Sequence, residues 1–155
     1  MILPITLTMA GAAALINIWL AIRTGRVRMS EKISIGDGGN ARLTARMRAH
    51  ANFTEYTPFV LILIGLIELA DGTSMWLWAV GAFYMLARIA HGFGMDGVRG
   101  LREFGIGATL LILLGLGLYA VAIPHLAQRG AAGQTELVST TAGNFTMPSL
   151  RVSVE

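Results

Sequence analysis

The stretch from residue 3 to residue 22 contains no charged side chain, and it limits what this chain can fold into more than any other feature. A helix of about 20 apolar residues crosses roughly 30 Å of membrane hydrocarbon. Three similar stretches follow, which gives four predicted spans, at 3–22, 49–70, 75–92 and 104–123. Continuous apolar runs favour helices over the alternating strands of a membrane barrel. We therefore predict an all-α membrane protein, a four-helix transmembrane bundle within residues 1–130.

The composition agrees with this prediction, because 54% of the residues are hydrophobic and only 14% are charged. The first span is longer than the apolar core of a signal peptide and no basic segment precedes it, so we expect it to be retained. Residues 131–155 are rich in Thr, Ser and Gly and are predicted to form a flexible polar tail. The absence of cysteine excludes disulfides, thiolate metal sites and a cysteine nucleophile. We expect no bound metal.

Ten of the twelve basic residues fall on one side of the predicted spans, and the positive-inside rule assigns that side to the cytoplasm. Both termini are then outside, and a bacterial inner membrane is the expected location. Topology explains the basic charge and no nucleic-acid-binding motif is present, so we expect no nucleic acid partner. The glycines of the loop sequence IGDGGN favour plain turns, since the spacing of a phosphate-binding loop is absent.

One polar face is predicted where the second span begins, within RMRAHANFTEYTPF. Arg48, Asn52 and Glu55 fall within about 60° of one another on a helix. A lone carboxylate in lipid is costly, so Glu55 must face the bundle interior, find a cation or be protonated. The third span repeats the pattern, with Arg88 and His91 on one face near the same end.

Other polar residues of the spans have simpler interpretations. His50 lies about 160° from Arg48 on the helix, which favours packing or hydrogen bonding over a ligand role. Asn17 could bond across helices, and Glu68 could reach the outer membrane interface. Structural roles are the commoner ones for such residues.

Basic residues outnumber acidic ones around the polar face. Arg28, Arg48, Arg88, Arg99 and Arg102 are set against Glu55, Asp96 and Glu103. A surplus of arginine suits an anionic ligand, since guanidinium groups bind carboxylates bidentately, and Glu55 could hold an ammonium group of the same ligand. For each residue alone, a structural ion pair between helices is the alternative.

The stretch RAHANFTEYTPF resembles the second-helix signature of the MAPEG family, the membrane-associated proteins of eicosanoid and glutathione metabolism. TGRVRM, RIAHGFG and RGLREFG agree with it, and the resemblance covers about residues 5–123. It implies a homotrimer of four-helix protomers that holds glutathione as co-substrate between subunits, near the cytoplasmic face. A lipophilic electrophile would arrive through the membrane lipids.

The resemblance also implies roles for particular residues. Five positions match those that hold glutathione in relatives, namely Arg28, Arg48, Asn52, Glu55 and Tyr56. Arg88 and His91 match a pair that lines the same cavity. An arginine near the start of the fourth helix stabilises the glutathione thiolate in that family, which makes Arg102 the first catalytic candidate and Arg99 the second. Cationic neighbours lower a thiol pKa, which makes this role physically sound.

Three positions depart from the prostaglandin-synthase branch of the family: Ala51 replaces an arginine, Glu103 a serine and Met95 a tyrosine. Glutathione binding is therefore better supported than catalysis, and the departures disfavour eicosanoid chemistry in particular. The expected function is a glutathione-dependent transferase or peroxidase. The alternatives are a non-catalytic binding or structural protein with the same fold, and a small transporter, which the arginine surplus disfavours.

Overall fold

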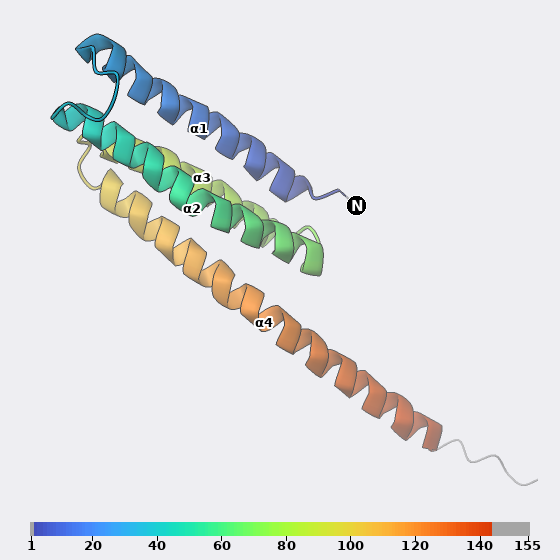
Figure 1. Cartoon of the computed structure of the whole chain (residues 1–155). Helices are drawn as coiled ribbons and strands as arrows, with labels where there is room; N and C mark the ends of the chain where they lie inside the picture. Colours follow the sequence, from blue (N-terminus) through green and yellow to red (C-terminus); the bar gives the residue numbers. More distant parts are fainter. Residues whose placement is uncertain (1, 144–155) are drawn as a thin grey trace, which may run out of the picture. The chain divides into compact units, whose positions relative to one another are not determined.

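The computed structural model describes the backbone of residues 2–143 and the side chains of residues 2–126 and 128. Four helices follow one another in this part of the chain, and it contains no strand (Figure 1). They are α1 (Pro4–Glu31), α2 (Ala41–Asp71), α3 (Met75–Gly94) and α4 (Leu101–Gly143). Helix α1 packs against α2 and α3, and α2 packs against α3. The predicted all-α, four-helix fold is confirmed.

The chain divides into two compact units, residues 1–120 and 121–155, and the candidate site lies wholly in the first. The described part of the second unit, residues 121–143, is helical backbone belonging to α4. Residues 131–143, the first part of the tail that was predicted to be flexible, are helical in the structure. The rest of that tail, 144–155, lies outside the described residues.

Three of the described helical segments are long and apolar enough to cross a membrane: Pro4–Glu31, Ala41–Asp71 and Leu101–Leu126. Helix α3 is not among them, although it has 20 residues. Its sequence includes Trp76, Trp78 and Tyr84 as well as Arg88 and His91, all of which lower its hydropathy. A membrane crossing by α3 therefore stays a prediction.

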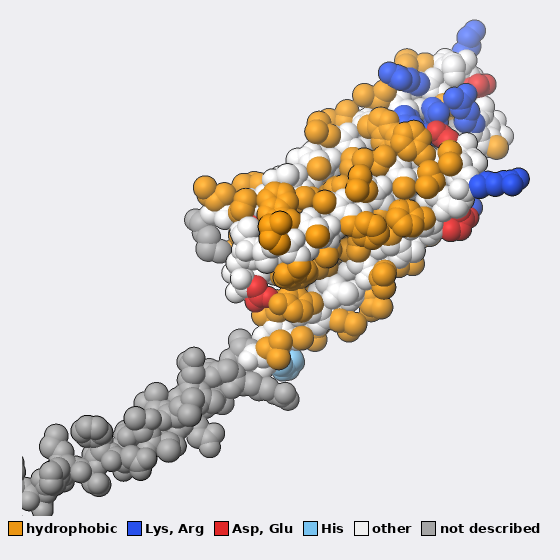
Figure 2. All heavy atoms as spheres, turned by 180° about the vertical axis from the view of Figure 1, so that it is seen from behind, with side chains coloured by type: hydrophobic (Ala, Val, Ile, Leu, Met, Phe, Trp, Pro, Cys, Tyr) orange, Lys and Arg blue, Asp and Glu red, His pale blue; other side chains and the backbone are white. Residues whose placement is uncertain are grey.

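The surface of the helices is apolar where a soluble protein would be polar. Figure 2 shows hydrophobic side chains over most of the visible bundle and Lys and Arg gathered at one end. Large apolar side chains such as Leu15, Leu111 and Leu118 are more than half exposed. Such a surface is stable in lipid rather than in water, and the charged end marks where lipid gives way to solvent.

The loop between α1 and α2 is built from turns, as its sequence predicts. Asp37 accepts hydrogen bonds from the Gly39 amide at 3.1 Å and from the Thr44 hydroxyl at 2.8 Å. These bonds favour the ionised carboxylate and lower the pKa of Asp37. Asn40 then caps α2 by accepting from the Leu43 amide at 3.0 Å.

Glu68 is buried between helices, with 1% of the residue exposed, and has the structural role that is the commoner one for such residues. It accepts bonds from the amides of Ile5 at 3.0 Å and Thr6 at 2.8 Å. The hydroxyls of Thr6 and Thr73 donate to it as well. Helix α1 has no side-chain cap of its own at Leu3, so Glu68 on α2 supplies the acceptor that α1 lacks.

Candidate functional site

Arg88 is the most deeply buried charged side chain among the predicted site residues, with 1% of its surface exposed. Its Nη2 donates to Asn52 Oδ1 at 2.8 Å and its Nη1 to Thr109 Oγ1 at 3.1 Å, and the guanidinium lies 5.7 Å from the Phe53 ring. Its Nε has no hydrogen-bond partner. Both ion pairs found among the described residues involve Asp96, so none neutralises Arg88.

His91 lies one helical turn beyond Arg88 and joins α3 to the start of α4. It is 5% exposed, and its Nδ1 is 3.3 Å from the backbone oxygen of Arg102. Two glycines allow this close approach: a Cβ on Gly105 would stand 2.5 Å from the Cβ of His91, and one on Gly94 would stand 2.1 Å from the Arg102 amide nitrogen. The predicted grouping of Arg88 with His91 is therefore present in the fold.

The polar face predicted on α2 divides into two parts. Asn52 points inward and joins Arg88, whereas Arg48 and Glu55 are exposed. Tyr56 is half-buried beside them. Glu55 therefore does not face the interior of its own chain, and neither of the ion pairs among the described residues involves it. At 100° per residue Glu55 lies about 20° from Arg48 around α2, and both side chains are on the outer surface.

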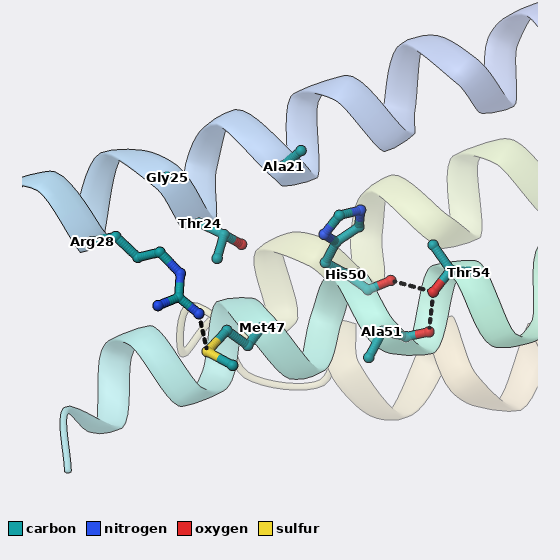
Figure 3. A pocket seen from close by; sticks show the side chains of 8 residues that line it. All are labelled: Ala21, Thr24, Gly25, Arg28, Met47, His50, Ala51 and Thr54. Atoms are coloured by element: carbon teal, nitrogen blue, oxygen red, sulfur yellow. Dashed lines mark hydrogen bonds between the residues drawn. The ribbon is translucent and has the colours of Figure 1, made fainter. Parts of the chain in front are cut away.

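Arg28 enters the site from α1 and lines a groove of about 460 Å³ between α1 and α2 (Figure 3). The other lining side chains are small or half-buried: Ala21, Thr24, Gly25, Met47, His50, Ala51 and Thr54. The Arg28 guanidinium is 3.3 Å from the Met47 sulfur and donates to the backbone oxygen of Gly36 at 2.9 Å. Arg28 is thus the one charged residue among those that line this groove, and these contacts hold its side chain in place.

Arg48 and Glu55 are not among the residues that line this groove, and they lie on the neighbouring exposed surface of α2. Relative to Ala51, which lines the groove, the two residues lie within about 60° on the helical wheel. His50 lines the groove, and its Nε2 is 2.8 Å from Asn17 Oδ1 on α1. That bond confirms the predicted roles of Asn17 in bonding across helices and of His50 in hydrogen bonding.

The two catalytic candidates lie at the turn from α3 into α4. Arg99 and Arg102 both have exposed side chains, and only the backbone oxygen of Arg102 contacts the buried part of the site. The turn itself uses Gly97 and Gly100, which have φ values of 102° and 78° that other residues rarely adopt. The fold thus brings the Arg102 backbone to His91 and leaves both side chains free.

Sequence reasoning missed a cluster that ties three helices together at the basic end. Asp96 accepts from Arg23 on α1 and, at 3.2 Å, from Arg46 on α2. The Arg23 guanidinium lies 4.4 Å from the Trp19 ring and 5.5 Å from that of Phe93. The pair Trp19 and Arg23, four residues apart on one helix, predicts their cation–π contact but gives no signal for Asp96 as the partner. Asp96 is consequently used by this cluster and not by the site arginines.

No group of three potential metal-ligating His, Asp or Glu side chains occurs in the part of the chain that the structure describes. The site is instead defined by arginines at several depths, one exposed glutamate and a groove of small residues at the basic end of a four-helix membrane bundle. These features define an integral membrane protein of the four-helix type. Comparison with known families identifies the family to which the chain belongs.

The model of the MAPEG family matches residues 6–122, so the chain belongs to the MAPEG family. It is also similar to the inner membrane protein YecN of Escherichia coli strain K12, with 32% identity over 91 residues. That alignment covers 57% of this chain and 69% of YecN. YecN of Escherichia coli O6:H1 strain CFT073 is similar to the same extent. The family match contains every predicted site residue.

Proposed function

We propose that this protein binds glutathione and uses it as a transferase or peroxidase acting on lipophilic electrophiles. The observation that carries the proposal is the exposed pair Arg48 and Glu55, which lie about one helical turn to either side of Ala51, a residue that lines the groove together with Arg28. The proposed assembly is a homotrimer in a bacterial inner membrane, with the basic end on the cytoplasmic side.

The depth of Glu55 in the membrane explains why the exposed side chains of Arg48 and Glu55 need a ligand or a protein partner. Glu55 is sixteen positions before Asp71, the last residue of α2, which is about 24 Å at 1.5 Å per residue. A hydrocarbon layer of about 30 Å that begins near Asp71 therefore includes Glu55. A charge exposed to lipid at that depth is unfavourable by several kcal/mol. A ligand and a neighbouring protomer that cover this face remove the penalty.

Glutathione has two carboxylates, one ammonium group and a thiol, and the available side chains complement them. The guanidinium groups of Arg28 and Arg48 suit the carboxylates, and Glu55 suits the ammonium group. Asn52 and Tyr56, which are near these charged residues on α2, offer neutral hydrogen-bonding groups. Arg88 stands behind Asn52 as a buried cation without a counter-ion, which makes the site attractive to a net anion.

Glutathione supplies the thiol, whose thiolate form is the nucleophile. Arg102, with Arg99 as the second candidate, provides the cation that favours the thiolate. The exposed Phe59 continues the Glu55 face toward the middle of α2 and gives an apolar approach for a substrate dissolved in lipid. His91 holds the start of α4 in place through the Arg102 carbonyl group.

A conjugation assay tests the enzymatic part of the proposal. The detergent-purified protein is incubated with glutathione and a panel of apolar electrophiles, and products are followed by mass spectrometry. Product formed faster than in buffer with glutathione alone supports a transferase. Tight glutathione binding with no acceleration for any electrophile or hydroperoxide contradicts the enzymatic proposal.

A specific observation favours a non-catalytic binding protein as the second candidate. The Arg99 and Arg102 side chains are exposed and make no hydrogen bond to another described side chain, and Glu103 follows directly in the first turn of α4. A carboxylate beside the candidate arginine opposes formation of a thiolate there. Replacing Glu103 by Ser and measuring conjugation separates the two functions, because only an enzyme gains rate.

A further inference from the structure

The exposed apolar face of α1 continues beyond the first charged residue of that helix. Leu15, Ile22 and Met29 are separated by seven residues each and therefore lie on one face. Their exposed fractions are 70%, 48% and 74%. Arg23 lies between the last two, so the lipid-facing stripe extends past the level at which charge first appears.

The loop after α1 brings a further aliphatic side chain to the same level. Arg28 donates to the backbone oxygens of Ser34 at 3.4 Å and Gly36 at 2.9 Å, which are the two neighbours of Ile35. Ile35 is therefore held near the level of Arg28, about 8 Å along the helix beyond Arg23. Its side chain is 91% exposed. The hydrocarbon layer is about 30 Å thick, and charge first appears on α1 at Arg23. A residue about 8 Å beyond Arg23 therefore lies among the lipid headgroups.

Two basic residues flank these apolar side chains. Arg26 follows Ile22 by four positions, and Lys32 ends α1 with its backbone in the left-handed conformation. Both are exposed, and both ion pairs among the described residues involve Asp96 instead. Lys32 also lines a cavity of about 540 Å³ together with Arg28, Met29, Ile33 and Ser34. Cations beside an exposed aliphatic surface at headgroup depth match an anionic lipid in both charge and polarity.

We propose that the end of α1 and Ile35 form a binding site for an anionic phospholipid of the membrane leaflet at the basic end. Arg26 and Lys32 bind the headgroup phosphate, and Met29 and Ile35 contact the upper acyl chain. Arg28 acts as a positioning residue, because its bonds to the loop carbonyl groups hold Ile35 at the required depth. Arg28 is shared with the proposed glutathione site, but the lipid is bound by Arg26 and Lys32, which glutathione does not use.

Native mass spectrometry of the detergent-purified protein tests this site. The probes are dioleoyl phosphatidylglycerol, dioleoyl phosphatidylcholine and inorganic phosphate. The variants are Arg26→Gln, Lys32→Gln and Ile35→Ser, with Lys32→Arg as the conservative change. Arg42→Gln is the matched control, because Arg42 is an exposed cation at the same end that lines a different cavity, beside Asp96. Glutathione titration and the oligomer mass of every variant are measured in parallel.

We expect the wild type to retain phosphatidylglycerol in preference to phosphatidylcholine. Arg26→Gln and Lys32→Gln each weaken phosphatidylglycerol binding about fivefold. Lys32→Arg and Arg42→Gln leave it unchanged, and Ile35→Ser weakens both lipids. Glutathione affinity is the same in all of these variants, so a failure of glutathione binding in the wild type does not bear on the lipid result.

Four results overturn the lipid site. The first is equal retention of the two lipids by the wild type, and the second is a loss in Arg42→Gln as large as in Lys32→Gln. The third is competition by inorganic phosphate at equal concentration, which identifies a free anion as the ligand. A change of oligomer mass in Ile35→Ser without any change in lipid binding also overturns it, because a second copy of the chain then covers this surface.

Discussion

Arg88 on α3 donates a hydrogen bond to Asn52 on α2 over 2.8 Å. The two residues are 36 positions apart, and each belongs to a different stretch of sequence that predicts the same site. The bond joins a buried cation to a neutral amide, so it orients Arg88 without neutralising it. The site keeps a positive charge that a ligand can use, at the cost of burying an unpaired guanidinium.

Asn52→Asp tests this arrangement. A carboxylate at position 52 would form an ion pair with Arg88 with almost no change in shape. We expect greater resistance to unfolding in detergent, by about 1 kcal/mol or more, and weaker glutathione binding. Asn52→Leu is the matched variant, in which the Arg88 donor is left unpaired and stability falls by about 1–3 kcal/mol. A lower stability of Asn52→Asp than of Asn52→Leu would contradict the conclusion that Arg88 has no neutralising partner in the wild type.

Gly105→Ala tests the close contact between α3 and α4. The added Cβ would stand 2.5 Å from the His91 Cβ and 2.8 Å from the Ala87 oxygen, so the helices must separate. We expect a loss of about 1–3 kcal/mol in the free energy of unfolding. Gly107→Ala is the control, since its Cβ would meet nothing within 4 Å and alanine favours helix. Equal stability of the two variants would contradict the close contact between α3 and α4, because the added methyl group would then fit without separating the helices.

Glu68→Ala removes the acceptor that α2 provides for the start of α1. The amides of Ile5 and Thr6 then lose their partner in a buried place. We expect the free energy of unfolding to fall by about 2 kcal/mol, with glutathione affinity unchanged, because Glu68 is at the opposite end from the site. Asp71→Asn, at an exposed position of the same helix end, should change stability much less. Loss of glutathione binding in Glu68→Ala, at a temperature where it is folded, would connect this end to the site.

Arg102→Ala separates binding from chemistry. We expect glutathione affinity to stay within about twofold, because the buried contact of Arg102 is made by its backbone. The conjugation rate should fall at least tenfold at neutral pH, since the thiolate loses its cation. Raising the pH should restore part of the rate, because more of the glutathione thiol is then deprotonated without a neighbouring cation. An unchanged rate removes Arg102 from the mechanism, and the same assay on Arg99→Ala then tests the second candidate.

The apolar runs predict the four helices because a long uncharged segment has few other stable forms in a membrane. Helical periodicity likewise predicts that Arg48, Asn52 and Glu55 share a face. It does not predict how packing divides that face, since the approach of α3 turns Asn52 inward and leaves Glu55 exposed.

Contacts between distant residues were the least predictable part. Asp96 was expected near the site arginines, but Arg23 and Arg46 bind it, because the approach of three helices determines which cation is nearest. A structural role was the commoner expectation for Glu68, but the sequence did not show that it would cap α1. Both outcomes depend on how the helices align lengthwise, which hydrophobic patterns do not encode.

Glutathione binding is the central claim, and calorimetric titration of the detergent-purified protein measures it most directly. The wild type is compared with Arg48→Ala and Glu55→Gln, whose oligomer mass is checked before titration. The account predicts binding by the wild type, its loss in both variants and an unchanged oligomer, because the partners of Arg48 and Glu55 are ligand groups. No binding by a folded wild-type oligomer, or variants whose oligomer dissociates without ligand, would contradict it and make the charged residues structural.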